Sequence, residues 1–262
     1  MTELIRKTTG SCPECTNTVP AVLLQDGDRI VIEKDCPEHG PNRALIAIAP
    51  EYFRELSAYF HDVLPESLPQ RDYILRLTGK CNMSCPICLA SANEYSEDDL
   101  PFEEIREKLK GRTRVKLDLM GAEPTLREDL VDIIAWGKNA GHILALHTNG
   151  IRLGDQEYTK KLVDAGLDEV HLQFDGFSDP HDLEVRGQLM NDHKKNALEN
   201  LKKYNIATDL VVTVLQGSNE DEMVKVLDYA AQNSFVKEVF FLGCRRLGRA
   251  TDDFEDQWLV PD

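Results

Sequence analysis

Three closely spaced cysteines are the residues in this chain whose types and spacing best suit chemistry. Cys81, Cys85 and Cys88 follow a strand-like run, residues 73–77, in a Cys-x3-Cys-x2-Cys spacing. Cysteine thiolates ligate iron–sulfur clusters, so three of them in one loop can hold three irons of a [4Fe–4S] cube. The fourth iron is then open to a small chelating molecule, which predicts a catalytic cluster rather than a simple electron carrier. The alternative is a zinc knuckle or buried thiols, but structural zinc takes four ligands, commonly from paired Cys-x2-Cys units.

A second group of metal-binding residue types occupies the first 50 residues. Two knuckles, Cys-Pro-Glu-Cys and Cys-Pro-Glu-His, enclose the runs 21–24 and 29–33, which flank an Asp-Gly turn typical of a hairpin. The predicted ligands of this ribbon are Cys12, Cys15, Cys36 and His39. A Cys3His set suits a tetrahedral zinc ion; a mononuclear, rubredoxin-like iron is the alternative, and His39 could be only a turn residue. So small a unit buries little core, so we expect the metal to hold it folded.

The remaining chain predicts a connecting helix in residues 51–70 and one large domain in residues 71–262. The helix has an apolar face of Tyr52, Phe53, Leu56, Tyr59, Phe60 and Val63 and is ended by Pro65 and Pro69. In the large domain, strand-like runs fall at 73–78, 115–120, 143–147, 169–174, 208–215 and 237–242. Helix-like runs alternate with them at 101–110, 126–139, 156–165, 192–204 and 219–233. This alternation predicts an α/β fold with a parallel sheet and right-handed crossovers.

Composition and charge disfavour several classes of function. The 262 residues are 42% hydrophobic and 29% charged, as in globular proteins. With 46 acidic against 30 basic residues the net charge is -16, which disfavours nucleic acids and anionic membranes as partners; Arg245, Arg246 and Arg249 form the one close basic group near the end. The sequence holds neither a transmembrane segment nor the apolar core of a signal peptide. Cysteines in metal-ligand spacings rather than a disulfide framework indicate a reducing, cytoplasmic location.

Polar and small residues follow the predicted strands, where barrels of parallel strands gather their chemistry. Gly121, Ala122 and Glu123 come after the second strand, and small residues there let backbone carbonyls approach a ligand closely. The alternative is a plain turn into the next helix. Thr148 and Asn149 end the third strand and can hydrogen-bond either hydroxyl groups or the local turn backbone.

The last three strands lead to further candidates. Gln173 and Asp175 alternate to one side of the fourth strand, which we expect to face the barrel interior, where polar groups need partners. Arg186 follows, and its planar fork suits a carboxylate, either of a ligand or of Asp175. Leu215 ends the fifth strand, and Cys244 follows the sixth. Cys244 could be a hydrogen-atom donor, a substrate anchor or a metal ligand; the alternative is a small buried hydrophobe.

Taken together, these motifs resemble the signature of the radical S-adenosylmethionine (SAM) superfamily over residues 73–248, with Ile87 where many members carry an aromatic residue. The resemblance implies a partial (β/α)6, TIM-like barrel after the metal-binding ribbon. It also implies that the amino and carboxylate groups of SAM chelate the open iron. The implied SAM contacts are Gly121, Ala122 and Glu123 for the ammonium, Thr148, Asn149, Gln173 and Asp175 for the ribose or substrate, Arg186 for the carboxylate and Leu215 for the adenine.

The resemblance further implies a reaction. A reductant of the ferredoxin or flavodoxin type reduces the cluster, SAM is cleaved to methionine and a 5'-deoxyadenosyl radical, and the radical takes hydrogen from an unactivated C–H bond. The substrate is expected to be a small molecule or lipid-like. The two knuckles and the run Leu-Gln-Phe-Asp-Gly are similar to the group of archaeal tetraether lipid synthases and radical SAM methylases of pterin precursors, which implies carbon–carbon coupling or methylation. Those relatives are longer and carry additional cysteines for auxiliary clusters.

Two other functions stay open. One is an iron–sulfur carrier or maturation protein without SAM turnover, and the other is a zinc-dependent interaction module in which all cysteines are structural. Gly121–Glu123, Gln173, Asp175 and Arg186 argue against both, because a carrier has no need of a SAM pocket.

Overall fold

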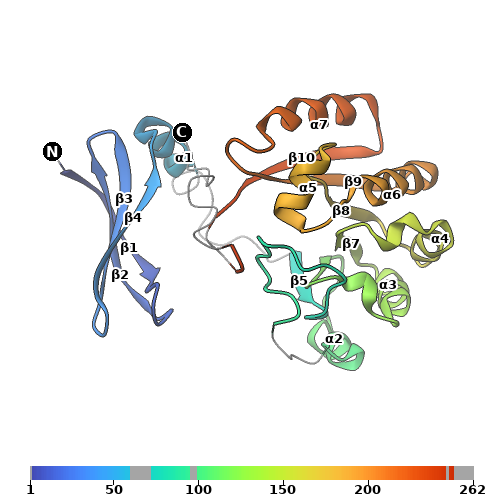
Figure 1. Cartoon of the computed structure of the whole chain (residues 1–262). Coiled ribbons are helices and arrows are strands. Elements are labelled where there is room, and N and C mark those ends of the chain that lie inside the picture. Colours follow the sequence, from blue (N-terminus) through green and yellow to red (C-terminus); the bar gives the residue numbers. More distant parts are fainter. Residues whose placement is uncertain (1, 60–71, 95–98, 246–247, 251–262) are drawn as a thin grey trace. The chain divides into compact units, whose positions relative to one another are not determined.

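The computed structural model describes residues 2–59, 72–94, 99–245 and 248–250 (Figure 1). The chain divides into two compact units, one within residues 1–69 and the other within residues 70–259. Part of the predicted connecting helix, with Phe60, Val63, Pro65 and Pro69, lies outside the described residues, as does Arg246. None of the helices in the described ranges is long and apolar enough to span a bilayer.

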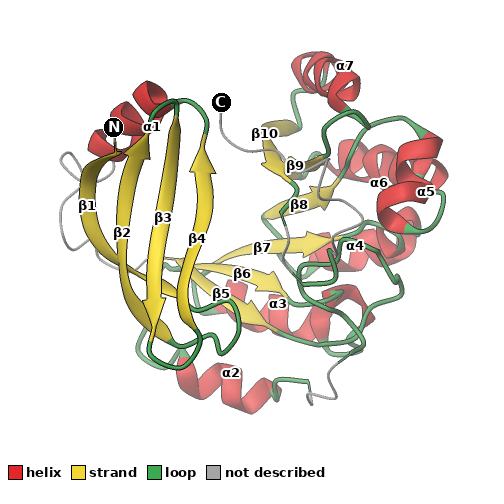
Figure 2. Cartoon of the chain, turned by 60° about the vertical axis from the view of Figure 1, so that its left-hand side comes forward, coloured by secondary structure: helices red, strands yellow, loops and turns green. Residues whose placement is uncertain are grey.

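The first unit is a four-stranded antiparallel sheet whose strands follow the order of the sequence (Figure 2). Its strands are β1 (Thr2–Ser11), β2 (Thr18–Asp26), β3 (Arg29–Cys36) and β4 (Gly40–Ala47). The predicted hairpin is β2 and β3, with Asp26 paired to Arg29 across a turn that Gly27 enters at φ +62°. The prediction missed β1 and β4, because both are edge strands with mostly exposed polar residues and so lack a clear apolar alternation.

The ribbon has only a small apolar core. Leu23, Ile30 and Ala47 are buried together, and Phe53 of helix α1 (Pro50–Ala58) packs against them. Of the other described aromatic residues predicted for this helix face, Tyr52 is 53% and Tyr59 56% exposed. Phe53 is therefore the aromatic side chain that the described part of the helix adds to this apolar core.

The second unit contains a six-stranded parallel sheet in which each strand pairs with its neighbour in the sequence. Its strands are β5 (Asp72–Arg76), β6 (Lys116–Met120), β7 (Ile143–Thr148), β8 (Glu169–Gln173), β9 (Ala207–Val214) and β10 (Val236–Gly243). In the described part of the chain β5 and β10 end the sheet without pairing to each other, so the barrel is open. The predicted α/β partial barrel is confirmed, and all six predicted strands are present.

Helices cover one face of this sheet, and α3, α4 and α6 follow one another along it in Figure 1. The helices are α2 (Phe102–Lys108), α3 (Leu130–Asn139), α4 (Gln156–Asp164), α5 (Asp179–Arg186), α6 (Asn191–Tyr204) and α7 (Glu220–Gln232). Alternate strand residues such as Leu117, Leu119 and Leu172 are fully buried against them in one core. The sequence did not predict α5, because this short segment is mostly polar.

Candidate active site

The residues predicted from strand-end motifs gather at one edge of the six-stranded sheet. Parallel strands bring their carboxyl ends to the same edge, so loops far apart in the sequence meet there. The loops carry Cys81, Cys85 and Cys88 after β5, Gly121, Ala122 and Glu123 after β6, Asn149 after β7, Asp175 after β8, Leu215 after β9 and Cys244 after β10. Thr148 and Gln173 are the last residues of β7 and β8, and Arg186 ends α5.

The cysteine loop is braced by its own polar residues. The Asn93 side chain accepts a hydrogen bond from the backbone N–H of Cys81 at 2.9 Å and donates to the Cys81 carbonyl at 3.1 Å. The backbone N–H groups of Met83 and Ala92 donate to the sulfurs of Cys81 and Cys88, at 3.3 and 3.4 Å. Hydrogen bonds to sulfur are one of the means by which proteins tune an iron–sulfur cluster.

The spacing of the three thiols suits a cluster better than a single ion. Burial raises the pKa of Cys81 to about 11, the Met83 N–H opposes it, and the Cys85 and Cys88 thiols raise it further, so the three sulfurs are near enough to interact. Within the described ranges, however, they are not among the groups whose ligand atoms all lie within 4.8 Å of one another. Wider spacing fits thiolates on separate irons, and binding would release their protons. The donor set therefore fits a [4Fe–4S] cluster.

Gly121 and Ala122 bring the β6 loop against the start of the cysteine loop. Gly121 has φ +137°, and a Cβ there would lie 2.5 Å from the Thr78 carbonyl oxygen. The N–H groups of Ala122 and Glu123 donate to the carbonyls of Thr78 and Lys80, both at 2.9 Å. The small residues thus allow two loops to meet closely; their contact with SAM stays a prediction.

Glu123 is fully buried and ties β6 to β7. Its Oε1 accepts from the Thr125 N–H at 3.1 Å and from the hydroxyls of Thr125 and Thr148 at 2.6 and 2.7 Å. Its Oε2 accepts from the Asn149 N–H at 2.8 Å. Burial raises the pKa of this carboxyl, and the Asn149 N–H opposes that rise. The Thr148 hydroxyl therefore donates to a carboxylate inside the protein, a partner that the sequence did not suggest. It also accepts from the Gly150 N–H at 3.1 Å, which is the turn-backbone contact that the sequence left open.

Asn149 reaches the cysteine loop directly. Its side-chain amide donates to Asn82 Oδ1 at 2.8 Å and lies 3.9 Å from Cys81 Sγ, while its Oδ1 accepts from the Ile151 N–H at 3.0 Å. The β7 loop is thus fastened beside one predicted cluster ligand.

Asp175 and Arg186 form the internal ion pair that the sequence left open as an alternative. Arg186 Nε and Nη2 donate to the two Asp175 oxygens at 2.7 and 2.9 Å, and Nη2 also donates to Thr213 Oγ1 at 3.1 Å. Burial would raise the pKa of Asp175, but Arg186 outweighs it and holds that pKa below its usual value. The guanidinium also interacts with the Cys85 thiol, so it links the strand ends to the cysteine loop.

Gln173 has one buried polar atom without a hydrogen-bond partner. Its Nε2 donates to Asp175 Oδ2, which places the two side chains on the same side of β8 as predicted. Its Oε1 is buried without a hydrogen-bond partner. A buried acceptor without a donor costs free energy, so it suits a ligand that brings an N–H or O–H group.

Leu215 and Cys244 lie in a small apolar cluster at the same edge. They are buried with Ile87, Val185 and Ala250. Burial raises the pKa of the Cys244 thiol. These surroundings favour the small buried hydrophobe over the hydrogen-atom donor, substrate anchor or metal ligand.

Sequence reasoning missed a row of polar residues on the sheet face opposite the helices. Its members are Lys116 and Asp118 on β6, His147 on β7, Glu169 and His171 on β8 and Asp209 on β9. His147 stacks on His171 at 4.2 Å between ring centres, and Asp118 contacts His147 Nε2 at 3.0 Å. These polar residues alternate strictly with buried leucines along the strands, and this alternation could have predicted the row.

The second missed feature is Arg249, near the end of the described chain. It contacts the carbonyls of Cys85 and Cys88, which no local pattern in the sequence indicates. The sequence identified Arg249 only as a member of the basic group that also contains Arg245 and Arg246.

In the ribbon, the structure brings the four predicted ligands together. The ligand atoms of Cys12, Cys15, Cys36 and His39 all lie within 4.8 Å of one another. Cys36 Sγ lies 3.6 Å from His39 Nδ1 and 3.8 Å from Cys15 Sγ. A backbone hydrogen bond from Cys15 lowers the pKa of Cys12 to about 7 against the effect of burial. This compact Cys3His set fits one tetrahedral ion such as zinc.

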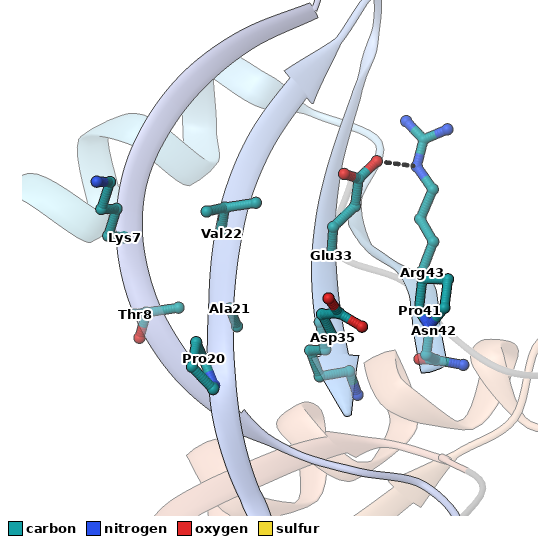
Figure 3. A pocket seen from close by; sticks show the side chains of 11 residues that line it. Lys7, Thr8, Pro20, Ala21, Val22, Glu33, Asp35, Pro41, Asn42 and Arg43 are labelled. Atoms are coloured by element: carbon teal, nitrogen blue, oxygen red, sulfur yellow. Dashed lines mark ion pairs between the residues drawn. The ribbon is translucent and has the colours of Figure 1, made fainter. Parts of the chain in front are cut away.

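A pocket also lies on the ribbon sheet, lined by residues of all four strands (Figure 3). Lys7, Pro20 and Asn42 are among the residues that line it, as are Glu33 and Arg43, which pair at 3.3 Å. None of the predicted metal ligands is among its lining residues, so it plays no part in the site described above.

Comparisons with known proteins agree with both units. Residues 75–230 match the profile of the Radical SAM superfamily, and residues 4–48 match that of the HMPTM N-terminal zinc ribbon domain. A 7,8-dihydro-6-hydroxymethylpterin dimethyltransferase of Methanocaldococcus jannaschii is 31% identical over 98% of this chain. A probable GTP 3',8-cyclase of Thermococcus kodakarensis is 28% identical over 68% of this chain.

The chain spans 57% of the length of the first relative and 59% of the second. Among solved structures, Streptococcus suis SuiB bound to S-adenosylmethionine has a TM-score of 0.59 over 87% of this chain and 63% of its own, at 10% identity, which supports the fold alone. The superfamily profile covers more than half of the 262 residues and includes all three cluster cysteines, so the chain belongs to the radical SAM superfamily.

Proposed function

We propose that the second unit is the catalytic barrel of a radical SAM enzyme, with a [4Fe–4S] cluster on Cys81, Cys85 and Cys88 and with SAM beside it. The observation that carries this proposal is the convergence of these thiols with polar groups from several strand ends at one sheet edge. When bound, the cluster and SAM supply a 5'-deoxyadenosyl radical that removes hydrogen from an unactivated C–H bond. A ferredoxin- or flavodoxin-type reductant supplies the electron.

The chain's own residues position the ligands. Asp175 fixes the Arg186 guanidinium through two hydrogen bonds beside Cys85, and a positive charge held there suits a carboxylate. The unpartnered Oε1 of Gln173 accepts a hydrogen bond from a hydroxyl or amino group of SAM. Glu123 holds the β6 and β7 loops together, so the groups around the cysteine loop stay in place without ligand.

For the substrate, we infer a small planar heterocycle rather than a lipid. The two relatives are named for a dihydropterin and for GTP, and both molecules contain a ring that carries adjacent N–H donors. On the sheet face opposite the helices, the carboxyl groups of Asp118, Glu169 and Asp209 lie beside the stacked rings of His147 and His171, with which Asp118 and Glu169 pair. Carboxylates beside flat rings suit such a donor-rich heterocycle, whereas a lipid chain needs an apolar lining. Methylation or carbon–carbon coupling on this ring is the reaction we expect.

In the ribbon, we infer that Cys12, Cys15, Cys36 and His39 hold a structural zinc ion. The close approach of their ligand atoms and the small apolar core support this role.

The test is 5'-deoxyadenosine formation by protein reconstituted without oxygen and incubated with SAM and a strong reductant, with and without a dihydropterin or GTP. We expect product from the wild type, stimulation by the heterocycle, and no product from Cys85→Ala although its zinc content is unchanged. Iron and sulfide in full amount without SAM binding would favour the iron–sulfur carrier, and zinc without iron would favour the interaction module.

A further inference from the structure

We propose that residues 248–250 lock the cysteine loop from outside, with Arg249 as the positioning residue that keeps Cys85 and Cys88 in the arrangement a cluster needs. The proposal rests on the proposed function, since it concerns how the cluster is held. It assigns a role to a segment that lies 164 residues beyond Cys85 in the sequence.

Arg249 fastens the loop through both its backbone and its guanidinium. Its N–H donates to the Cys88 carbonyl at 3.0 Å, and its Nη1 donates to the Cys85 carbonyl at 3.2 Å. Its Nη2 donates to the carbonyl of Ala92, and its Nε pairs with Glu94. One side chain therefore joins three points along the loop. Only arginine has the planar set of donors needed for this, because lysine is a single point charge.

The residues on either side of Arg249 complete the lock independently. Gly248 has φ +61°, and a Cβ there would collide with the Cys88 carbonyl oxygen and lie 2.6 Å from that of Leu89. Ala250, which is 5% exposed, packs in the apolar cluster that contains Ile87, the residue just before Cys88. The segment thus approaches the loop by close backbone contact, hydrogen bonds and apolar packing.

The two halves of the loop are held differently. The loop's own Asn93 braces Cys81, and Asn149 of the β7 loop lies beside it. The carbonyls of Cys85 and Cys88 accept from the N–H groups of Cys88 and Ser91 within the loop, at 3.3 and 3.2 Å, and Arg249 adds a hydrogen bond to each from far along the chain. Its positive charge also lies near both thiols, where it offsets the negative charge of a thiolate-bound cluster. Loss of Arg249 should therefore loosen the half of the loop that carries two of the three ligands.

The experiment compares Arg249→Gln and Arg249→Lys with Arg245→Gln, a matched control from the same tail whose side chain takes no part in these contacts. Each full-length protein is reconstituted without oxygen, and its iron and sulfide contents are measured. The rate of iron loss to a chelator is then followed, in the absence of SAM, as the decrease in visible absorption of the cluster. Zinc content and circular dichroism report on the fold. We expect both Arg249 variants to lose iron roughly tenfold faster than wild type, since charged hydrogen bonds are lost, and the control to match wild type.

Two results would overturn the proposal. Iron loss at the wild-type rate from both Arg249 variants would remove the residue from the lock, and wild-type retention by Arg249→Lys alone would show that charge suffices without positioning. Gly248→Ala provides a second variant, which keeps the Arg249 side chain but should weaken iron retention because its Cβ pushes the segment away from the Cys88 carbonyl. Failure of the wild type itself to take up iron and sulfide would instead refute the proposed function, so the two failures are distinguishable.

Discussion

The Arg186 guanidinium and the Asp175 carboxylate face each other through two hydrogen bonds, 2.7 and 2.9 Å long, and both side chains are nearly removed from solvent. A buried ion pair keeps its geometry because separating the two charges would leave each of them desolvated and unpaired. The same guanidinium interacts with the Cys85 thiol. One buried pair therefore connects the ends of β8 and α5 to the predicted cluster loop.

Arg186→Ala should destabilise the protein and weaken SAM binding. Removal of one partner leaves the Asp175 charge buried and unpaired, which costs about 3–5 kcal/mol of unfolding free energy. Loss of a charged hydrogen bond to the SAM carboxylate should reduce SAM affinity by about 1.5–3 kcal/mol. Urea unfolding and equilibrium SAM binding measure the two effects. The double variant Arg186→Leu with Asp175→Leu should recover most of the stability but not the affinity; unchanged affinity would exclude Arg186 from the SAM site.

Glu123→Gln should lower the free energy of unfolding by about 1–3 kcal/mol, because an amide cannot accept at both ends. The carboxylate oxygens of Glu123 receive only donors, and the NH2 group of glutamine would face the Asn149 N–H or the threonine hydroxyls. The exposed neighbour Glu128→Gln is the control and should leave stability unchanged. Equal stability of both variants in chemical denaturation would contradict the bracing role of Glu123.

Asp209 should make stability depend on pH. Burial and the nearby carboxylates of Glu169 and Glu238 raise the pKa of Asp209 to about 7, well above its unfolded value. The folded state therefore binds this proton more tightly than the unfolded state, and the resulting stability is present at acidic pH and lost as pH rises through about 7. Asp209→Asn should gain stability relative to wild type between pH 4 and pH 8.

Urea unfolding across that range measures the difference. The exposed Asp132→Asn serves as the control for a surface substitution of the same type. A stability difference for Asp209→Asn that does not change with pH would contradict the raised pKa of Asp209.

The two metal sites should be lost independently. Cys36→Ser should remove the ribbon metal and unfold the ribbon while iron stays on the barrel, because the ligand sets lie in separate compact units. Cys85→Ala should do the reverse. Metal analysis of both variants after anaerobic reconstitution decides this, and simultaneous loss of iron and zinc in either variant would contradict two separate sites.

Local patterns predicted the sheet well. The six strands were visible because residues such as Leu117 and Leu119 recur at every second position and face the helices. The ribbon ligands were visible because both knuckles repeat a Cys-Pro-Glu pattern. Helix α5 was missed because its burial depends on partners elsewhere, such as Lys194, which donates to the buried Asp182 at 2.5 Å.

Contacts between side chains far apart in the chain could not be predicted from the sequence. Asn219 stands at the N-cap position of α7, but its side chain makes no cap hydrogen bond, and its amide donates to the carbonyls of Asp175 and Thr213, both at 3.0 Å. Glu123 was expected to face SAM, and its partners on β7 become visible only once β6 and β7 lie side by side. Such contacts depend on which loops meet at the sheet edge, and one sequence does not specify that meeting.

The contact between Arg249 and the cysteine loop also has a consequence for the order of events during synthesis. The ribosome makes the chain from its N-terminus, so Cys85 and Cys88 emerge long before the residue that secures them. A chain still growing at α7 has all three cysteines but no lock on them. Stable insertion of the cluster should therefore occur only after the whole barrel has been synthesised. A chain released before residue 249 should bind iron only weakly.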